Sequence, residues 1–165
     1  MNSAPSDARR FSRTRTLVLG MLAVGTVDIL WAFGNAALSG KGPIWLLQTI
    51  AGGLLHREAY EGGMATAFLG MFLHYFIAGS IVTVYYLASR KLPLLVERAW
   101  LCGPIYGIGV YLFMQLVVLP LARWGGGLNP GIGMAKALFI HMFGVGLIAA
   151  LVVRRGPAPG KAQAP

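Results

Sequence analysis

The chain has 165 residues, of which 56% are apolar and 12% are charged, and its mean hydropathy is +0.67. Soluble domains average about 45–50% apolar and about 25% charged residues, so the composition excludes an ordinary soluble domain. A formal net charge of +9 would suit a nucleic-acid-binding protein, but the basic residues are divided among short segments between apolar runs. The single cysteine, Cys102, excludes an intramolecular disulfide and a cysteine-based metal cluster.

The chain begins with a basic stretch that also contains serine, proline and alanine. Residues 1–16 are predicted to be a disordered cytoplasmic tail whose arginines contact anionic lipid. Arg9 and Arg10 precede an apolar run, as in a twin-arginine signal peptide. That run is longer than the roughly 7–15 residues of a signal-peptide core and contains Asp28, so we expect it to remain as the first helix.

Four apolar runs predict an all-α membrane protein with four transmembrane helices. A helix needs about 20 apolar residues to span the hydrocarbon core of a bilayer. The runs cover residues 17–38, 64–88, 99–121 and 134–153, and together they form a single transmembrane domain, 17–153. Residues 154–165 are predicted to be a second disordered cytoplasmic tail.

The segment between the first two runs has the pattern of a further, shorter helix. Pro43 suits the first turn of a helix, and leucine and isoleucine residues recur after it at helical spacing. We predict a helix over about 43–60 that lies in the outer interface or dips into the membrane as a re-entrant segment. The glycine pair 52–53 is expected to kink or break it.

The remaining loops are short. Residues 89–98 are predicted to form a tight turn in which Pro93 prevents a continuous helix. Residues 123–133 contain two glycine-rich groups, but no Gly-Lys-Ser/Thr follows them, so they match no phosphate-binding pattern.

The distribution of basic residues predicts the orientation of the helices. Positively charged residues are enriched in the cytoplasmic loops of membrane proteins. With the N-terminus inside, ten basic residues fall on the cytoplasmic side and four on the outer side. The inner set is Arg9, Arg10, Arg13, Arg15, Arg90, Lys91, Arg98, Arg154, Arg155 and Lys161, and the outer set is Lys41, Arg57, Arg123 and Lys136. Both termini are therefore expected in the cytoplasm.

Few polar side chains lie within the four runs, and these are the candidate functional residues. At about 1.5 Å per residue, Asp28, His141 and His74 lie roughly 16–21 Å from the cytoplasmic ends of their helices, near the middle of a core about 30 Å thick. Ionisable residues at this depth are costly and often relay protons, although each could instead only bond a neighbouring helix. The predicted polar layer, a candidate proton or ligand site, consists of Asp28, His74, His141, Gln115, Asn35 and Tyr111.

Small residues recur on the same helix faces as the polar groups. Small residues allow the backbones of membrane helices to approach closely, so these faces are expected to point into the bundle. The predicted helix-packing positions are Gly25, Gly70, Gly103, Gly107 and Gly144.

Two cofactor hypotheses follow from the histidines. His74 and His141 differ in depth by about 3 Å, which is compatible with a b-type haem held between them. A metal ion held by these two histidines and Asp28 is a second hypothesis. Neither is favoured, because the chain has no second histidine pair and no Cys-x-x-Cys-His motif.

Part of the chain resembles the uncharacterised YagU-like bacterial inner-membrane proteins. The resemblance covers about the last hundred residues and rests on Gly70-Met71-Phe72-Leu73-His74, Val84-Tyr85-Tyr86, Arg90-Lys91-Leu92-Pro93, Gly103, Gly107, Val117-Val118-Leu119-Pro120-Leu121, His141 and Arg154-Arg155. It implies a bacterial inner-membrane protein of undefined activity. Asp28 lies outside it, so only His74 and His141 carry over as polar positions.

The function expected from the sequence is proton-linked or small-solute transport through the polar layer, without enzymatic activity. The alternative is a membrane assembly or accessory factor that binds itself or a partner through glycine-rich faces, such as Gly103 and Gly107. A haem-binding or other redox subunit is the third hypothesis.

Overall fold

The computed structural model describes residues 11–122 and 127–157, and these residues form helices and no strands. The elements are α1 (Arg13–Leu38), α2 (Pro43–Leu55), the 3₁₀ helix η2 (His56–Tyr60), α3 (Gly63–Lys91), α4 (Leu94–Glu97), α5 (Ala99–Phe113), the π-helix η3 (Met114–Val118), α6 (Leu119–Leu121), α7 (Ile132–Ile140), the π-helix η4 (His141–Leu147) and α8 (Ile148–Arg154). The predicted all-α membrane fold is confirmed.

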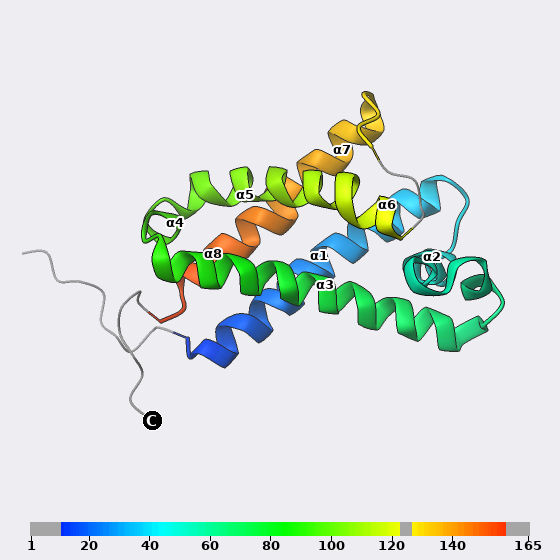
Figure 1. Cartoon of the computed structure of the whole chain (residues 1–165), viewed down its shortest axis with the longest axis horizontal. Helices are drawn as coiled ribbons and strands as arrows, with labels where there is room; N and C mark the ends of the chain where they lie inside the picture. Colours follow the sequence, from blue (N-terminus) through cyan, green and yellow to red (C-terminus); the bar gives the residue numbers. More distant parts are fainter. Residues whose placement is uncertain (1–10, 123–126, 158–165) are drawn as a thin grey trace, which may run out of the picture.

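Four helices are long and apolar enough to cross a membrane: Arg13–Leu38, Gly63–Lys91, Ala99–Leu121 and Ile132–Arg154. The third span consists of α5, η3 and α6, and the fourth of α7, η4 and α8. Successive spans run in opposite directions (Figure 1). The chain is therefore a multi-pass membrane protein.

The first span begins earlier than the sequence predicts. Ser12 caps α1, because its side-chain oxygen accepts a hydrogen bond from the backbone N–H of Arg15 at 3.2 Å. Thr16 is fully buried. The boundary predicted at residue 16 is thus wrong, since the last four residues of the expected tail are helical.

The two described ends of the chain meet. The backbone N–H of Phe11 donates to the carbonyl of Arg155 at 2.7 Å, and Arg90 donates to the carbonyl of Pro157 at 2.8 Å. The first residues of the tail predicted at 154–165 are therefore bonded to the bundle. The rest of both predicted tails lies outside the described residues, as does Arg123.

The helix α2 lies across one end of the bundle. In Figure 1 it is seen nearly end-on, whereas the four spans run across the picture. Gln48 fixes it to α3 by donating to the carbonyl of Gly63 at 3.1 Å, and Thr66 donates to the carbonyl of Ala59 at 2.6 Å. This arrangement is that of an interfacial helix.

The glycine pair in α2 does not break the helix, contrary to the sequence prediction. The α-helix continues to Leu55, and the chain turns at His56, which has a φ of 52°. A positive φ is unfavourable for a non-glycine residue and ends the helix there. The chain then continues in η2, so the predicted segment 43–60 is two helices.

The loop predicted at 89–98 is largely helical. The helix α3 continues to Lys91, and α4 occupies Leu94–Glu97. Pro93 separates the two helices as the N-cap of α4, since proline fits the start of a helix better than its interior.

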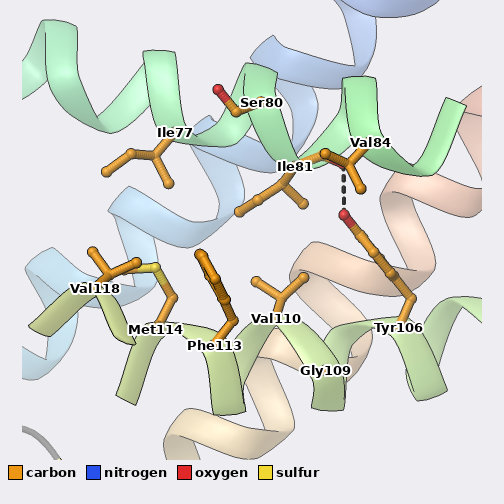
Figure 2. Close-up of a pocket in the computed structure, with 10 residues that line it drawn as sticks. All are labelled: Ile77, Ser80, Ile81, Val84, Tyr106, Gly109, Val110, Phe113, Met114 and Val118. Atoms are coloured by element: carbon orange, nitrogen blue, oxygen red, sulfur yellow. Dashed lines mark hydrogen bonds between the residues drawn. The ribbon is translucent and has the colours of Figure 1, made fainter. Parts of the chain in front are cut away.

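The bundle is built from two closely packed pairs of spans. In the first pair, α1 packs on α3 with Gly20 against Val82 and Gly25 against Tyr75. In the second pair, α5 packs on the fourth span, where Gly103 lies against Gly146. By contrast, α3 and α5 face each other across a groove, with α1 and the fourth span behind them (Figures 1 and 2).

Each of the last two spans contains a π-helical segment, which lies near the C-terminal end of the third span and in the middle of the fourth. Pro120 follows the first segment and has no backbone N–H to bond the carbonyl four residues earlier, which loosens the preceding turns. Such π-segments are often found at functional sites. Here they contain Met114 in the third span and His141 in the fourth.

Candidate functional site

Three of the predicted polar residues line one cavity between the spans. The cavity has a volume of about 70 Å³ and is lined by Val24, Asp28, His74, Ile77, Ala78, Ile81, Met114, His141 and Val145. A water molecule needs at least about 10–15 Å³, so the cavity has room for a few waters. The three ionisable residues come from three different spans, and the third span contributes Met114.

His74 binds the first span. Its Nε2 lies 2.8 Å from the carbonyl oxygen of Gly25 on α1. A carbonyl accepts only, so Nε2 carries the proton and donates, and in the neutral ring Nδ1 keeps a free lone pair. The ring also packs edge-on against Tyr75, with 5.5 Å between the ring centres. His74 is thus held in place through one nitrogen and able to accept a proton at the other.

His141 is held in the same way by its own helix. Its Nδ1 lies 2.7 Å from the carbonyl oxygen of Ala137 and therefore donates to it. In the neutral ring, Nε2 is the nitrogen with the free lone pair. The ring of Tyr111 lies edge-on to the imidazole at 5.5 Å between ring centres. Tyr111 therefore touches the site as a packing partner of His141 and does not itself line the cavity.

Asp28 is half-buried on α1 and lines the same cavity. Within the described part of the chain its carboxyl group makes no hydrogen bond and no ion pair, and its oxygens are not fully buried. Unlike the two histidines, Asp28 is therefore free to bond a water, a proton or a ligand at both oxygens.

Two residues of the predicted polar layer lie elsewhere. Asn35 donates to the carbonyl of Trp31 at 2.9 Å, one turn back on its own helix. Gln115 is half-buried in η3 and is not among the residues that line the cavity. Asn35 lies on the same face of α1 as Asp28 but two turns further along the helix, so its depth takes it away from the cavity. Gln115 follows Met114, which lines the cavity, and therefore points to a different side of its helix.

All five predicted packing glycines lie at close contacts. A Cβ atom at Gly70 would overlap the carbonyl of Leu47 on α2, and one at Gly25 would lie 2.7 Å from the ring of Tyr75. A Cβ at Gly103 would lie 2.8 Å from the Cα of Leu147, and one at Gly107 would overlap the carbonyl of His141. At Gly144 it would lie 2.5 Å from Ile140 and 3.2 Å from Val27 of α1.

These contacts contradict the hypothesis that the chain binds another protein through the faces of Gly103 and Gly107. The faces of Gly103 and Gly107 are covered by the fourth span of the same chain, at distances that leave no space for a side chain. They are therefore not free to bind a second protein, as the sequence alone allowed.

The cavity does not fit the two cofactor hypotheses. A volume of about 70 Å³ is far below the roughly 300 Å³ at which pockets for drug-sized ligands begin, so a haem does not fit between His74 and His141. Nε2 of His74 is also already bonded to a carbonyl. Over residues 11–122 and 127–157, no group of three His, Cys, Asp or Glu side chains is arranged to hold a metal ion.

A second, larger pocket was not predicted from the sequence. It is a groove of about 350 Å³ between α3 and the third span, and almost all of its wall is apolar (Figure 2). Tyr106 closes one end by donating to the carbonyl of Ile81 at 2.8 Å. Ile77, Ile81 and Met114 line both the groove and the polar cavity, so the two spaces are neighbours.

These features define a multi-pass all-α membrane protein with a small polar cavity between its spans and an apolar groove beside it. No family model, curated protein or solved structure matches the chain. The resemblance to YagU-like proteins therefore stays a prediction, and the functional argument rests on the site alone.

Proposed function

We propose that this protein moves protons, alone or coupled to a small solute, across a bacterial inner membrane through the cavity of Asp28, His74 and His141. The observation that carries the proposal is that these three titratable side chains, on three different spans, line one cavity. A few waters in the cavity would connect them, since a water bridges polar groups nearly as well as a direct hydrogen bond does.

The chemistry of the three groups supports proton transfer. Each neutral imidazole has one nitrogen fixed by a carbonyl and one that can take up a proton. Asp28 accepts a proton at either oxygen and has no competing partner in the described part of the chain. Asn35 differs from Asp28 in this respect, because its side chain is already bonded to its own helix.

Proton flux into lipid vesicles tests the proposal. The purified protein is placed in vesicles that contain a pH-sensitive dye, and a potassium gradient with valinomycin supplies the driving force. We expect acidification of the vesicles to be faster with protein than in protein-free vesicles. Equal rates with and without protein, at a confirmed protein content, would contradict proton movement.

The orientation is a second part of the proposal. We infer that both termini and the α4 region face the cytoplasm. The excess of basic residues in these segments supports this orientation. Cysteine labelling in intact bacteria tests this, in a Cys102→Ser background. We expect a membrane-impermeant maleimide to label Ser39→Cys, which follows α1, but to label Glu97→Cys only after the cells are opened. The reverse pattern would invert the orientation.

A further inference from the structure

The groove between α3 and the third span points to the kind of solute that the cavity receives. We propose that the solute is a lipophilic amine, in which a primary ammonium group on an apolar chain binds in the polar cavity while the chain lies in the groove. This inference rests on the proposed function, because the ammonium group would occupy the cavity through which protons move.

The polar cavity provides acceptors that match an ammonium group. A primary ammonium has three N–H donors and no acceptor. Three of the residues that line the cavity have acceptor capacity left, at the carboxylate of Asp28, Nδ1 of His74 and Nε2 of His141. No lysine or arginine lines it, so the charge of Asp28 has no fixed cation beside it. A cationic ligand would neutralise this carboxylate in a medium where an unpaired charge is costly.

The size of the cavity fits the ammonium group alone. Its volume of about 70 Å³ suits a group of the size of a few waters and excludes the remainder of a long molecule. Any larger ligand must therefore place its apolar part in a neighbouring space.

The groove is that neighbouring space. Its volume of about 350 Å³ falls within the range of small-molecule pockets, which begin at roughly 300 Å³. The polar groups at its wall are already bonded to backbone carbonyls: Ser80 to Phe76 at 2.9 Å, and Tyr106 to Ile81 at 2.8 Å. The hydroxyl donors of the groove are therefore already used, and its largely apolar wall suits a hydrocarbon chain.

The wall shared by the two spaces provides a route between them. Ile77, Ile81 and Met114 line both (Figure 2 shows all three at the groove). Methionine has an unbranched, flexible side chain that adapts to its neighbours, so a rotation of Met114 opens the wall without moving a helix. A ligand dissolved in the bilayer would then enter sideways, ammonium group first.

The acid–base chemistry couples this ligand to protons. Asp28 in its protonated form holds no charge for an ammonium to pair with, and ammonium binding requires the carboxylate. Binding of the cation and binding of a proton at Asp28 therefore exclude each other. Exchange of one for the other moves the amine and the proton in opposite directions.

Equilibrium binding of radiolabelled decylamine to the protein in lipid nanodiscs tests the inference. We expect saturable binding at one site above the level of empty nanodiscs, with much weaker competition by decanol and decanoate. Asp28→Asn should weaken binding by at least about tenfold, because it removes the charge that pairs with the ammonium.

Two glycine variants test whether the apolar chain of the amine lies in the groove. Gly109 lines the groove, and a Cβ there meets no atom within 4 Å, so Gly109→Leu adds a side chain that fills the groove without a backbone clash. It should also weaken decylamine binding by at least about tenfold. Gly34 on α1 is equally unhindered and lies outside the groove, so Gly34→Leu should bind as the wild type does.

Three results would overturn the inference. Equal competition by decanol would mean that the groove holds a hydrocarbon chain alone, such as that of a lipid. Wild-type binding by Gly109→Leu would place the amine elsewhere. Loss of a dimer in Gly109→Leu, without decylamine binding by the wild type, would mean that a second copy covers the groove.

The two experiments distinguish failure of the amine inference from failure of the proposed function. Proton flux in vesicles without amine binding in nanodiscs would overturn the amine inference and leave proton movement intact. Amine binding that depends on Asp28, without flux in vesicles under either a proton or an amine gradient, would support the ligand site and overturn transport.

Discussion

Gly107→Leu is expected to abolish the native packing of the last two spans. A side chain at this position would overlap the carbonyl oxygen of His141 and would begin 2.7 Å from the Cα of Met142. Both are backbone atoms of the fourth span, so no side-chain rotation relieves the clash and the helices must separate. Overpacking costs about 1–3 kcal/mol of folding free energy where side chains can adjust. We expect a clash with backbone atoms to cost more.

The measurement is the thermal unfolding of the purified protein in detergent, with the yield of monodisperse protein as a second readout. We expect little or no folded Gly107→Leu protein. Gly109→Leu is a matched control two residues away, because a Cβ atom there meets no atom within 4 Å and the side chain extends into the groove. An unfolding temperature for Gly107→Leu equal to that of the control would contradict the tight contact between α5 and η4.

The same contact links helix packing to the candidate site. The carbonyl that lies against Gly107 belongs to His141, whose ring lines the cavity. Glycines on both sides allow this approach, since a Cβ at Gly146 would overlap the carbonyl of Gly103. The position of His141 relative to Asp28 and His74 therefore depends on small residues that carry no chemistry themselves.

Much of this fold follows directly from the sequence. The four spans and α2 were predictable because apolar length and helical spacing depend on local sequence alone. The ends of the elements were less predictable. The start of α1 at Arg13 depends on the Ser12 cap and on the contact between Phe11 and Arg155, which joins distant parts of the chain.

The candidate site was predictable in part, and the difference lies in depth along the helix and in rotation about the helix axis. The depths of Asp28, His74 and His141 follow from the rise per residue, and they line one cavity. Asn35 does not line it because it lies two turns beyond Asp28, and Gln115 does not because it lies beside Met114 on another side of a π-helical segment. The groove had no signal in the sequence, since its apolar residues resemble any lipid-facing surface.

Asp28→Asn is expected to reduce proton flux in vesicles to the level of protein-free vesicles. Asparagine keeps the size of the side chain and can still form hydrogen bonds, but it cannot bind and release a proton. Asp28 bonds no other described residue, so its replacement removes no helix contact and the folded protein should be nearly as stable as the wild type. Asn35→Ala is the control on the same helix, because Asn35 bonds its own helix outside the cavity.

The histidine variants show whether the three groups act together. His74→Gln and His141→Gln should each lower proton flux, because glutamine cannot carry a proton between partners. Adding His141→Gln to Asp28→Asn should cause no further loss, since residues in one network have non-additive effects. A structural role predicts a different pattern, in which each variant lowers the unfolding temperature and flux falls only in proportion to the folded protein. Wild-type flux per folded Asp28→Asn molecule would therefore exclude this carboxyl group from the path of the proton.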